Sequence, residues 1–262
     1  MPRSEKPFSS RKVSGKLLKG QRLDIVGTQE NFQKDTGQVA SAAGMKDIYD
    51  PRSYKFLGGH GLATLFKTEH TLVRFESLRF NRQSLLERGL DRGAVYALIE
   101  LRPGQRINFY NTHLTTDLQP NSESVRLAQV NELKAFIDRT ADEGYPTVVV
   151  GDFNSARGWV AQNKAREDLG VESWDAQFGG NNGTHTWDPL RCPMQPIYEL
   201  FGLHYGPLEI DLIFINGLEG ELSAIASERH YQASRKGKVP RDATEYATDH
   251  ALVTCDWKGF GR

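Results

Sequence analysis

The apolar run Val148-Val149-Val150 stops at Gly151, and two polar residues, Asp152 and Asn154, follow at alternate positions. The run has the length and composition of a strand, and a glycine marks its end. Because side chains alternate faces along an extended segment, we expect Asp152 and Asn154 to point the same way. An aspartate can bind a hard cation or hold a water, and an asparagine can donate to a phosphate oxygen without adding charge. This segment therefore predicts the polar edge of an active site.

The same arrangement, an apolar strand with a carboxylate or a histidine at its end, recurs along the chain. The predicted strands cover 23–27, 62–66, 72–80, 95–101, 107–110, 147–150, 210–215 and 251–255. The clearest helix is predicted over 122–140, with Ser122 as its N-cap, and shorter helices are predicted over 11–22 and 38–46. Many short strands with few helices between them predict two packed sheets with helices outside.

Seven polar side chains lie at the ends of these strands. Each one alone has an ordinary explanation, since aspartate and asparagine are common in turns and a histidine beside a strand is often a packed residue. The set has two histidines, several carboxylates and no cysteine, a composition that suits Mg²⁺, Mn²⁺ or Ca²⁺ better than zinc. Such a site suits phosphate-ester hydrolysis. The seven residues are Glu30, His113, Asp152, Asn154, Asp211, Asp249 and His250.

Bulk composition narrows the class of protein. The 262 residues suffice for one large domain or two small ones, and 38% hydrophobic with 25% charged residues is an ordinary soluble profile. Lys+Arg and Asp+Glu both total 33, which weakens non-specific nucleic-acid binding but leaves a local basic cleft open. No apolar run approaches the ~20 residues of a membrane span, and no secretory signal is seen, so a soluble, cytoplasmic protein is expected. Two cysteines favour a reduced compartment, with a single bridge left open.

The N-terminal segment, residues 1–22, is basic and is interpreted as a solvated tail that leads into the first helix. Its serine content and scarcity of acid also resemble a transit peptide loosely. Residues 23–262 are predicted to form the functional domain.

Six motifs together resemble those of the endonuclease/exonuclease/phosphatase superfamily, which includes DNase I-like nucleases, inositol polyphosphate 5-phosphatases and neutral sphingomyelinases. The resemblance covers roughly residues 23–257. It implies a DNase I-like four-layer α/β sandwich, in which two mostly antiparallel sheets are flanked by helices, and Mg²⁺-dependent phosphoester hydrolysis. In chain order the motifs are Gln29-Glu30, Gly61-Leu62-Ala63-Thr64-Leu65, Asn111-Thr112-His113-Leu114, Gly151-Asp152-Phe153-Asn154, Ile210-Asp211-Leu212-Ile213 and Thr248-Asp249-His250.

By this resemblance, Glu30 is the principal ligand of the metal, Mg²⁺ with Mn²⁺ or Ca²⁺ as alternatives, and Asp249 assists the metal or its waters. Asp152 would orient or deprotonate the attacking water.

The same resemblance assigns the remaining residues to the phosphate. Asn154 and His113 would hold its oxygens, and Asp211 would fix the imidazole of His250.

Three further stretches are most similar to the sphingomyelinase C branch. They include Arg92, a candidate substrate-binding residue where the branch commonly has lysine. The simpler explanations are that Arg92 is a charged residue in a surface turn, that Arg126 and Gln129 lie on a solvated helix face, and that Trp187 only packs. The stretches are Asp91-Arg92-Gly93-Ala94-Val95-Tyr96, the pair Arg126 and Gln129, and Thr186-Trp187-Asp188-Pro189.

The leading hypothesis is a Mg²⁺-dependent phosphodiesterase that acts on a phospholipid or a small phosphodiester. A nuclease of the same fold is the first alternative, and a truncated, weakly active or non-catalytic relative is the second. The second alternative arises because the family opens with a strand carrying a metal-supporting asparagine, and residues 1–22 contain no such strand. The missing strand would be explained equally well if the natural protein starts upstream of residue 1, or if the N-terminal segment takes the place of that strand. The sequence carries no signal for the oligomeric state.

Overall fold

The computed structural model describes residues 10–21, 23–30, 35–49, 61–84, 87, 91–116, 121–172, 185–187, 208–217, 224–230 and 252–257. These residues form four helices and eleven strands within the described ranges. In chain order the elements are α1 (Ser10–Gln21), β1 (Ile25–Thr28), α2 (Asp35–Ala43), β2 (Met45–Tyr49), β3 (Ala63–Lys67), β4 (Thr71–Arg79), β5 (Gly93–Arg102), β6 (Gln105–His113), α3 (Ser122–Thr140), β7 (Thr147–Asp152), α4 (Val160–Asp168), β8 (Val171–Glu172), β9 (Asp211–Asn216), β10 (Ala224–His230) and β11 (Leu252–Trp257).

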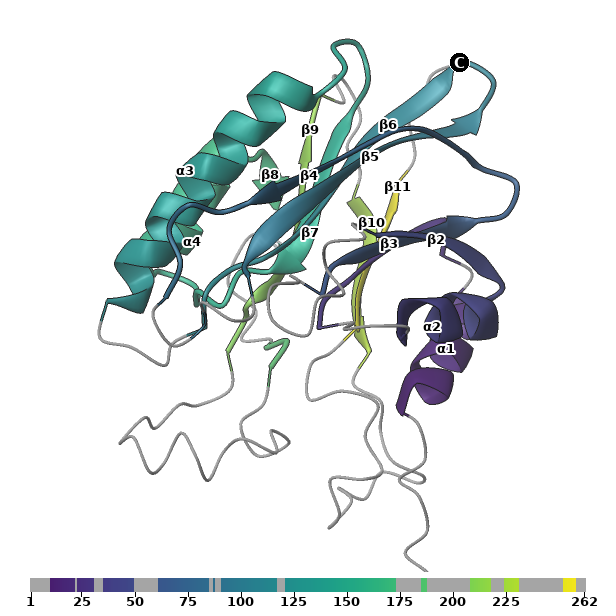
Figure 1. The fold of residues 1–262 in the computed structure, drawn as a ribbon, viewed down its shortest axis with the longest axis horizontal. Helices are drawn as coiled ribbons and strands as arrows, with labels where there is room; N and C mark the ends of the chain where they lie inside the picture. The colour runs from purple at the N-terminus through teal and green to yellow at the C-terminus, as the bar shows by residue number, and fades with distance from the viewer. Residues whose placement is uncertain are drawn as a thin grey trace, which may run out of the picture.

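The largest layer is a six-stranded sheet with the strand order β4-β5-β6-β7-β9-β8. Every neighbouring pair in it is antiparallel except β6 and β7, which run parallel. Helices α3 and α4 cover one face of this sheet (Figure 1). The face of α3 that packs on the sheet is apolar, and its Val130, Leu133, Phe136 and Ile137 are buried. The predicted N-cap is wrong: Asn121 precedes the helix and makes no side-chain cap hydrogen bond.

The other face of the large sheet packs against a second layer of strands. This layer contains a three-stranded sheet, β1-β3-β2, and a two-stranded sheet, β10-β11. Phe66 of β3 joins Ile107, Val148 and Ile213 of the large sheet in one apolar cluster. Strand β11 lies against β9.

Helices α1 and α2 form the outermost layer beyond the three-stranded sheet (Figure 1). Leu18 of α1 and Val39 of α2 share a buried cluster with Val26 and Leu65 of the strands. The four layers, helices, sheet, sheet and helices, confirm the predicted α/β sandwich. The domain boundary placed at residue 22 stays a prediction.

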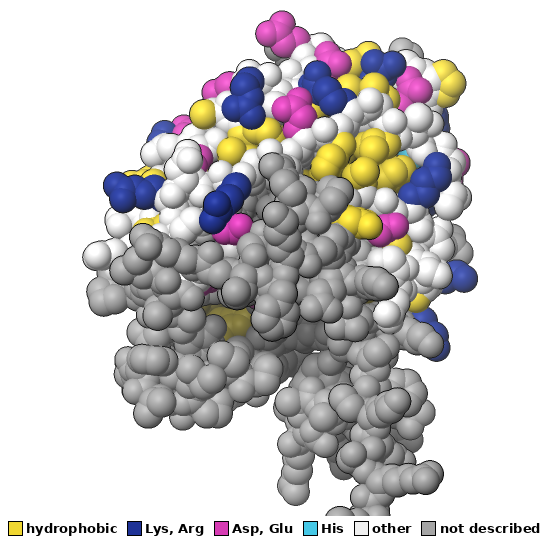
Figure 2. Space-filling view, viewed as in Figure 1, with side chains coloured by type: hydrophobic (Ala, Val, Ile, Leu, Met, Phe, Trp, Pro, Cys, Tyr) yellow, Lys and Arg dark blue, Asp and Glu magenta, His cyan; other side chains and the backbone are white. Residues whose placement is uncertain are grey.

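All eight predicted strands and all three predicted helices correspond to observed elements. The prediction missed four elements, namely β2, α4, β8 and β10. Among the described residues, no helix combines the length and the hydropathy needed to cross a membrane. On the face drawn in Figure 2, lysine and arginine side chains of the described residues are interspersed with aspartate and glutamate.

Candidate active site

The pairing of four strands brings Gly93, His113, Asp152 and Asp211 into one row across the large sheet. Gly93 is paired with His113 between β5 and β6, and His113 is paired with Asp152 between β6 and β7. Asp152 is paired in turn with Asp211 of β9. His113 and Asp152 are the last residues of their strands, and Asp211 is the first of its own. The sheet therefore places three of the predicted site residues side by side at one edge.

The row faces the interface between the two sheets. Val150 and Ile213 pack in the cluster that contains Phe66 of the small sheet. Because side chains alternate along a strand, Asp152 and Asp211, two positions away, are on the same side. The row thus forms the rim of the contact between the sheets.

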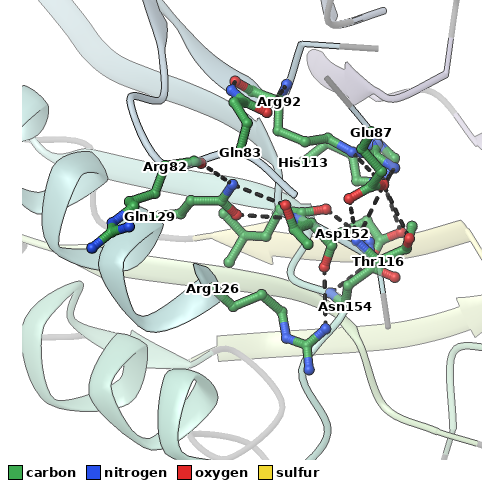
Figure 3. Close-up of polar contacts among 12 residues, drawn as sticks. Arg82, Gln83, Glu87, Arg92, His113, Thr116, Arg126, Gln129, Asp152 and Asn154 are labelled. Carbon is green, nitrogen blue, oxygen red and sulfur yellow. Dashed lines mark hydrogen bonds and ion pairs between the residues drawn. The ribbon is translucent and has the colours of Figure 1, made fainter. Parts of the chain in front are cut away.

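Arg92 joins this row from the residue before β5. Its NH1 lies 2.6 Å from Nδ1 and 2.7 Å from Nε2 of His113, and the His113 Nε2 lies 3.4 Å from Oδ2 of Asp152 (Figure 3). All three side chains are buried, and Arg92 is only 2% exposed. Arg92 is therefore not a surface turn charge, and the structure brings it together with His113 and Asp152.

Glu87 holds the guanidinium of Arg92 in place. Its Oε1 accepts a hydrogen bond from Nε of Arg92 at 3.0 Å and also contacts NH2. The same carboxylate accepts from the backbone N and from Oγ1 of Thr116 (Figure 3). Glu87 is 2% exposed, so this is a buried ion pair with further hydrogen bonds. Sequence reasoning missed Glu87, because no periodic pattern or motif marks it.

Asn154 reaches the site by a route that differs from the prediction. The strand ends at Asp152, and Asn154 has a left-handed backbone with φ of 48°. Its backbone N donates to Oδ1 of Asp152 at 2.8 Å, and its Nδ2 donates to the carbonyl of Leu114 at 3.0 Å. The expected alternation of Asp152 and Asn154 on one extended segment is therefore wrong. The turn instead makes the backbone of Asn154 a hydrogen-bond donor to the Asp152 carboxylate.

Three non-glycine residues in the described ranges have a positive φ, and each is a predicted site residue or the sequence neighbour of one. They are Glu30 at 57°, Asp91 at 34° and Asn154 at 48°. Glu30 follows β1, Asp91 directly precedes Arg92, and Asn154 follows Asp152 in the same turn. Such conformations are sparsely populated for residues with a Cβ, so the surrounding structure must hold each of them.

Helix α3 supports the segment that follows His113. Gln129 accepts a hydrogen bond from Thr115 N at 2.9 Å and donates to Thr115 Oγ1 and to the carbonyl of Arg82. Arg126, labelled in Figure 3, donates to the carbonyl of Thr115 at 3.2 Å, and it also pairs with Glu123. Both α3 side chains are buried, so they do not form a solvated helix face. Their role is to fix the loop beside Arg92 and Glu87.

Thr186 anchors the start of β9 and with it Asp211. Its buried Oγ1 accepts hydrogen bonds from the backbone N of Ile210 at 3.0 Å and of Asp211 at 2.9 Å. The neighbouring Trp187 packs against Ile210 in a small apolar cluster and forms a β-bridge with Leu208. Thr186 thus positions Asp211, a predicted catalytic residue, and Trp187 packs against Ile210.

Glu30 is the one predicted metal ligand that the structure describes. Its side chain is exposed and makes no ion pair or side-chain hydrogen bond with another described residue. An exposed carboxylate can bind a hard divalent cation. No group of three or more His, Cys, Asp or Glu that could hold a metal occurs within the described ranges. The second predicted ligand, Asp249, and the predicted catalytic His250 lie outside those ranges.

Solved structures with the same fold include a TDP2, a beta toxin and a mannosyl-6-phosphatase. A Danio rerio TDP2 complexed with a single-strand DNA product is 17% identical, with a TM-score of 0.67 over 96% of this chain and 93% of that chain. Beta toxin from Staphylococcus aureus is 16% identical, with a TM-score of 0.67 over 95% and 93%. A Bacteroides thetaiotaomicron mannosyl-6-phosphatase is 15% identical, with a TM-score of 0.63 over 94% and 90%. At these identities the likeness shows the fold alone.

A comparison with curated protein sequences finds no match. Residues 15–254, most of the chain, match the Endonuclease/Exonuclease/phosphatase family. This family comprises hydrolases of phosphoester bonds that generally depend on a divalent metal. The four-layer sandwich agrees with that match. The chain belongs to the Endonuclease/Exonuclease/phosphatase family.

Proposed function

We propose that this protein is a Mg²⁺-dependent phosphodiesterase, similar to sphingomyelinase C, that acts on a phospholipid or a related small phosphodiester. The observation that carries the proposal is the contact of Arg92 with His113 and of His113 with Asp152 at the rim between the sheets. This arrangement combines a cationic donor, an imidazole and a carboxylate, which are the groups needed to hold a phosphoryl oxygen and to orient a water.

In the proposed mechanism Asp152 orients or deprotonates the attacking water. The hydrogen bond from the backbone of Asn154 to Oδ1 fixes one oxygen of this carboxylate. The other oxygen, Oδ2, is the one nearer His113. A base held on both sides keeps its direction while the water attacks, which lowers the entropic cost of reaching the transition state.

The phosphoryl oxygens are held by Arg92, His113 and the amide of Asn154. Asp211, at the end of the same row, is proposed to orient His250, which would assist the leaving group. Glu30 and Asp249 would hold the metal ion, which supplies charge neutralisation at the phosphoryl group when bound.

Apart from the metal ion, the charge of the described side chains favours a phosphodiester over a phosphomonoester. The positive charge of Arg92 is balanced by its buried ion pair with Glu87. Asp152 and Asp211 add negative charge to the same edge. A diester carries one negative charge and a monoester close to two, so the diester meets less repulsion.

A small or lipid diester is favoured over nucleic acid. Basic and acidic residues are equal in number at 33 each, and the face in Figure 2 intermixes both charges among the described residues. Proteins that follow a nucleic-acid backbone usually carry a continuous basic surface.

The experiment compares the purified protein on sphingomyelin micelles and on supercoiled plasmid, in Mg²⁺ and in EDTA. We expect phosphocholine release that EDTA abolishes and added Mg²⁺ restores, and release at least about a hundredfold slower by Asp152→Asn. Plasmid nicking without phosphocholine release would replace the lipid substrate with nucleic acid. Hydrolysis that persists in EDTA would contradict the metal mechanism.

A further inference from the structure

The buried side chain of Asn111 joins the two sheets close to the candidate site. Asn111 belongs to β6 of the large sheet, and its Nδ2 donates to the carbonyls of Thr28 and Ala63, both at 2.9 Å. Its Oδ1 accepts a hydrogen bond from Nε2 of Gln29 at 2.7 Å. Both N–H groups of the amide therefore cross from the large sheet to the small one.

The backbone of β1 comes close enough for these bonds because Gly27 has no side chain. A Cβ at position 27 would lie 2.3 Å from Cγ2 of Val150 and 2.9 Å from Cγ of Asn111. Thr28 and Ala63, whose carbonyls accept from Asn111, are paired with each other at the ends of β1 and β3. One amide thus fixes the ends of two strands against a third.

We propose that Asn111 is a positioning residue for Glu30, the candidate metal ligand. Asn111 lies two residues before His113, and Thr28 lies two residues before Glu30. The three hydrogen bonds of the Asn111 side chain, to Thr28, Gln29 and Ala63, are called the clamp below. Each of the two-residue steps spans about 7 Å of extended chain, so the clamp is close to both functional side chains. The inference rests on the proposed function, since it takes Glu30 as the ligand.

The backbone of Glu30 explains why a clamp is needed. Its φ of 57° is unfavourable for a residue with a Cβ, and such conformations persist only where the surroundings impose them. Asn111 holds both residues that precede Glu30, Thr28 through its carbonyl and Gln29 through its side chain. Without these bonds, the end of β1 would relax, and the carboxylate of Glu30 would no longer be held in register with His113.

The chain offers a closely matched control on the same strand. Asn108 is also fully buried, and its Nδ2 donates to two backbone carbonyls, those of Asp142 at 3.0 Å and of Tyr145 at 3.1 Å. Asn111→Asp and Asn108→Asp each replace a double donor with a carboxylate facing two carbonyl oxygens. Only Asn111→Asp affects the end of β1.

Two measurements test the clamp in both variants. Hydrogen exchange of the peptide that covers residues 25–30 should become faster in Asn111→Asp and stay unchanged in Asn108→Asp. The dissociation constant for Mn²⁺, followed by electron paramagnetic resonance, should rise about tenfold or more in Asn111→Asp, as is typical when a residue that orients a metal ligand is lost. In Asn108→Asp it should stay close to that of the wild type.

Unchanged hydrogen exchange over residues 25–30 in Asn111→Asp would overturn the clamp, and so would equal changes in Mn²⁺ affinity in the two variants. Glu30→Gln separates this proposal from the proposed function. If Glu30→Gln binds Mn²⁺ like the wild type, Glu30 is not a ligand, and the inference that Asn111 positions a ligand fails. Faster hydrogen exchange over residues 25–30 in Asn111→Asp would then show only that Asn111 holds the end of β1. Should Asn111→Asp not fold, Gln29→Met removes a single bond of the clamp and is measured in the same way.

Discussion

The guanidinium of Arg92 lies against the ring of His113, with NH1 2.6 Å from Nδ1 and 2.7 Å from Nε2. An arginine can only donate hydrogen bonds, so the ring nitrogen that receives its N–H acts as an acceptor. With its proton on Nε2, the ring accepts from Arg92 at Nδ1 and points its N–H toward Oδ2 of Asp152, 3.4 Å away; a phosphoryl oxygen held by His113 would take this N–H in place of Asp152. A polar chain of buried side chains therefore runs from Glu87 through Arg92 and His113 to Asp152.

The ion pair of Glu87 and Arg92 provides the first prediction. Arg92→Met would leave a buried carboxylate without its cation, and the free energy of unfolding should fall by about 3–5 kcal/mol. The double variant Arg92→Met/Glu87→Met should be less destabilised than the sum of the two single variants, because neither charge is then buried alone. Urea unfolding of the four proteins measures the coupling.

The pair of Lys134 and Asp138 on α3 is the control for this measurement. Nζ of Lys134 lies 2.6 Å from Oδ1 of Asp138, and the two side chains are 35% and 59% exposed. Solvent screens such a pair, so Lys134→Met should cost about 1 kcal/mol or less. A cost for Arg92→Met as small as that for Lys134→Met would contradict the buried pair.

Asp152→Asn is expected to separate chemistry from folding. The amide oxygen can still accept the hydrogen bond from Asn154 N, so the unfolding midpoint should change little. The loss of a general base should lower kcat by roughly 10²–10⁴-fold. Steady-state kinetics and thermal unfolding test this together, with Asp138→Asn on the exposed side of α3 as the control. A variant with full turnover would remove Asp152 from the mechanism.

Thr186→Val tests how Asp211 is positioned. The valine has a similar shape, but the backbone N–H groups of Ile210 and Asp211 lose their shared acceptor. Each unsatisfied buried donor costs about 1–3 kcal/mol, so the urea concentration at the midpoint of unfolding should fall clearly. Turnover should fall as well. Thr186→Ser keeps the hydroxyl and should retain most of both properties. Equal behaviour of the two variants would show that the hydroxyl does not matter.

Alkaline pH should destabilise the protein through Tyr110. Burial raises the pKa of its phenol, and the hydrogen bond with Thr140 opposes this only in part. Above pH 10.0, the ordinary value, the unfolded chain loses the proton while the folded chain keeps it, so the free energy of unfolding falls as the pH rises. One such group contributes up to about 1.4 kcal/mol per pH unit.

Tyr110→Phe should therefore flatten the decline in stability between pH 10 and 11, as measured by urea unfolding at each pH. Burial also raises the pKa of Tyr96, so part of the decline should remain in this variant. The same slope in the variant and in the wild type would contradict the assignment to Tyr110.

Some site residues could be predicted because their signal is local. A strand needs a continuous apolar run, and the residue that ends it is adjacent in the sequence, so His113 and Asp152 stand out at the ends of 107–110 and 147–150. The turn at Asn154 was predicted wrongly, because the left-handed conformation is stabilised by Asp152 and Leu114 through contacts that no periodicity encodes. Glu87 was missed for the same reason: its partners, Arg92 and Thr116, come from separate segments.

The sequence by itself determined the family and all the elements except β2, α4, β8 and β10, because hydrophobic periodicity and short motifs act over a few residues. Only the tertiary structure decided which side chains meet. The register of β5, β6, β7 and β9 aligned Gly93, His113, Asp152 and Asp211, and a shift of one residue in any strand would have turned its polar group to the helix side. The contact of Asn111 with β1 depends likewise on the packing of two sheets, a long-range property that local sequence patterns do not contain.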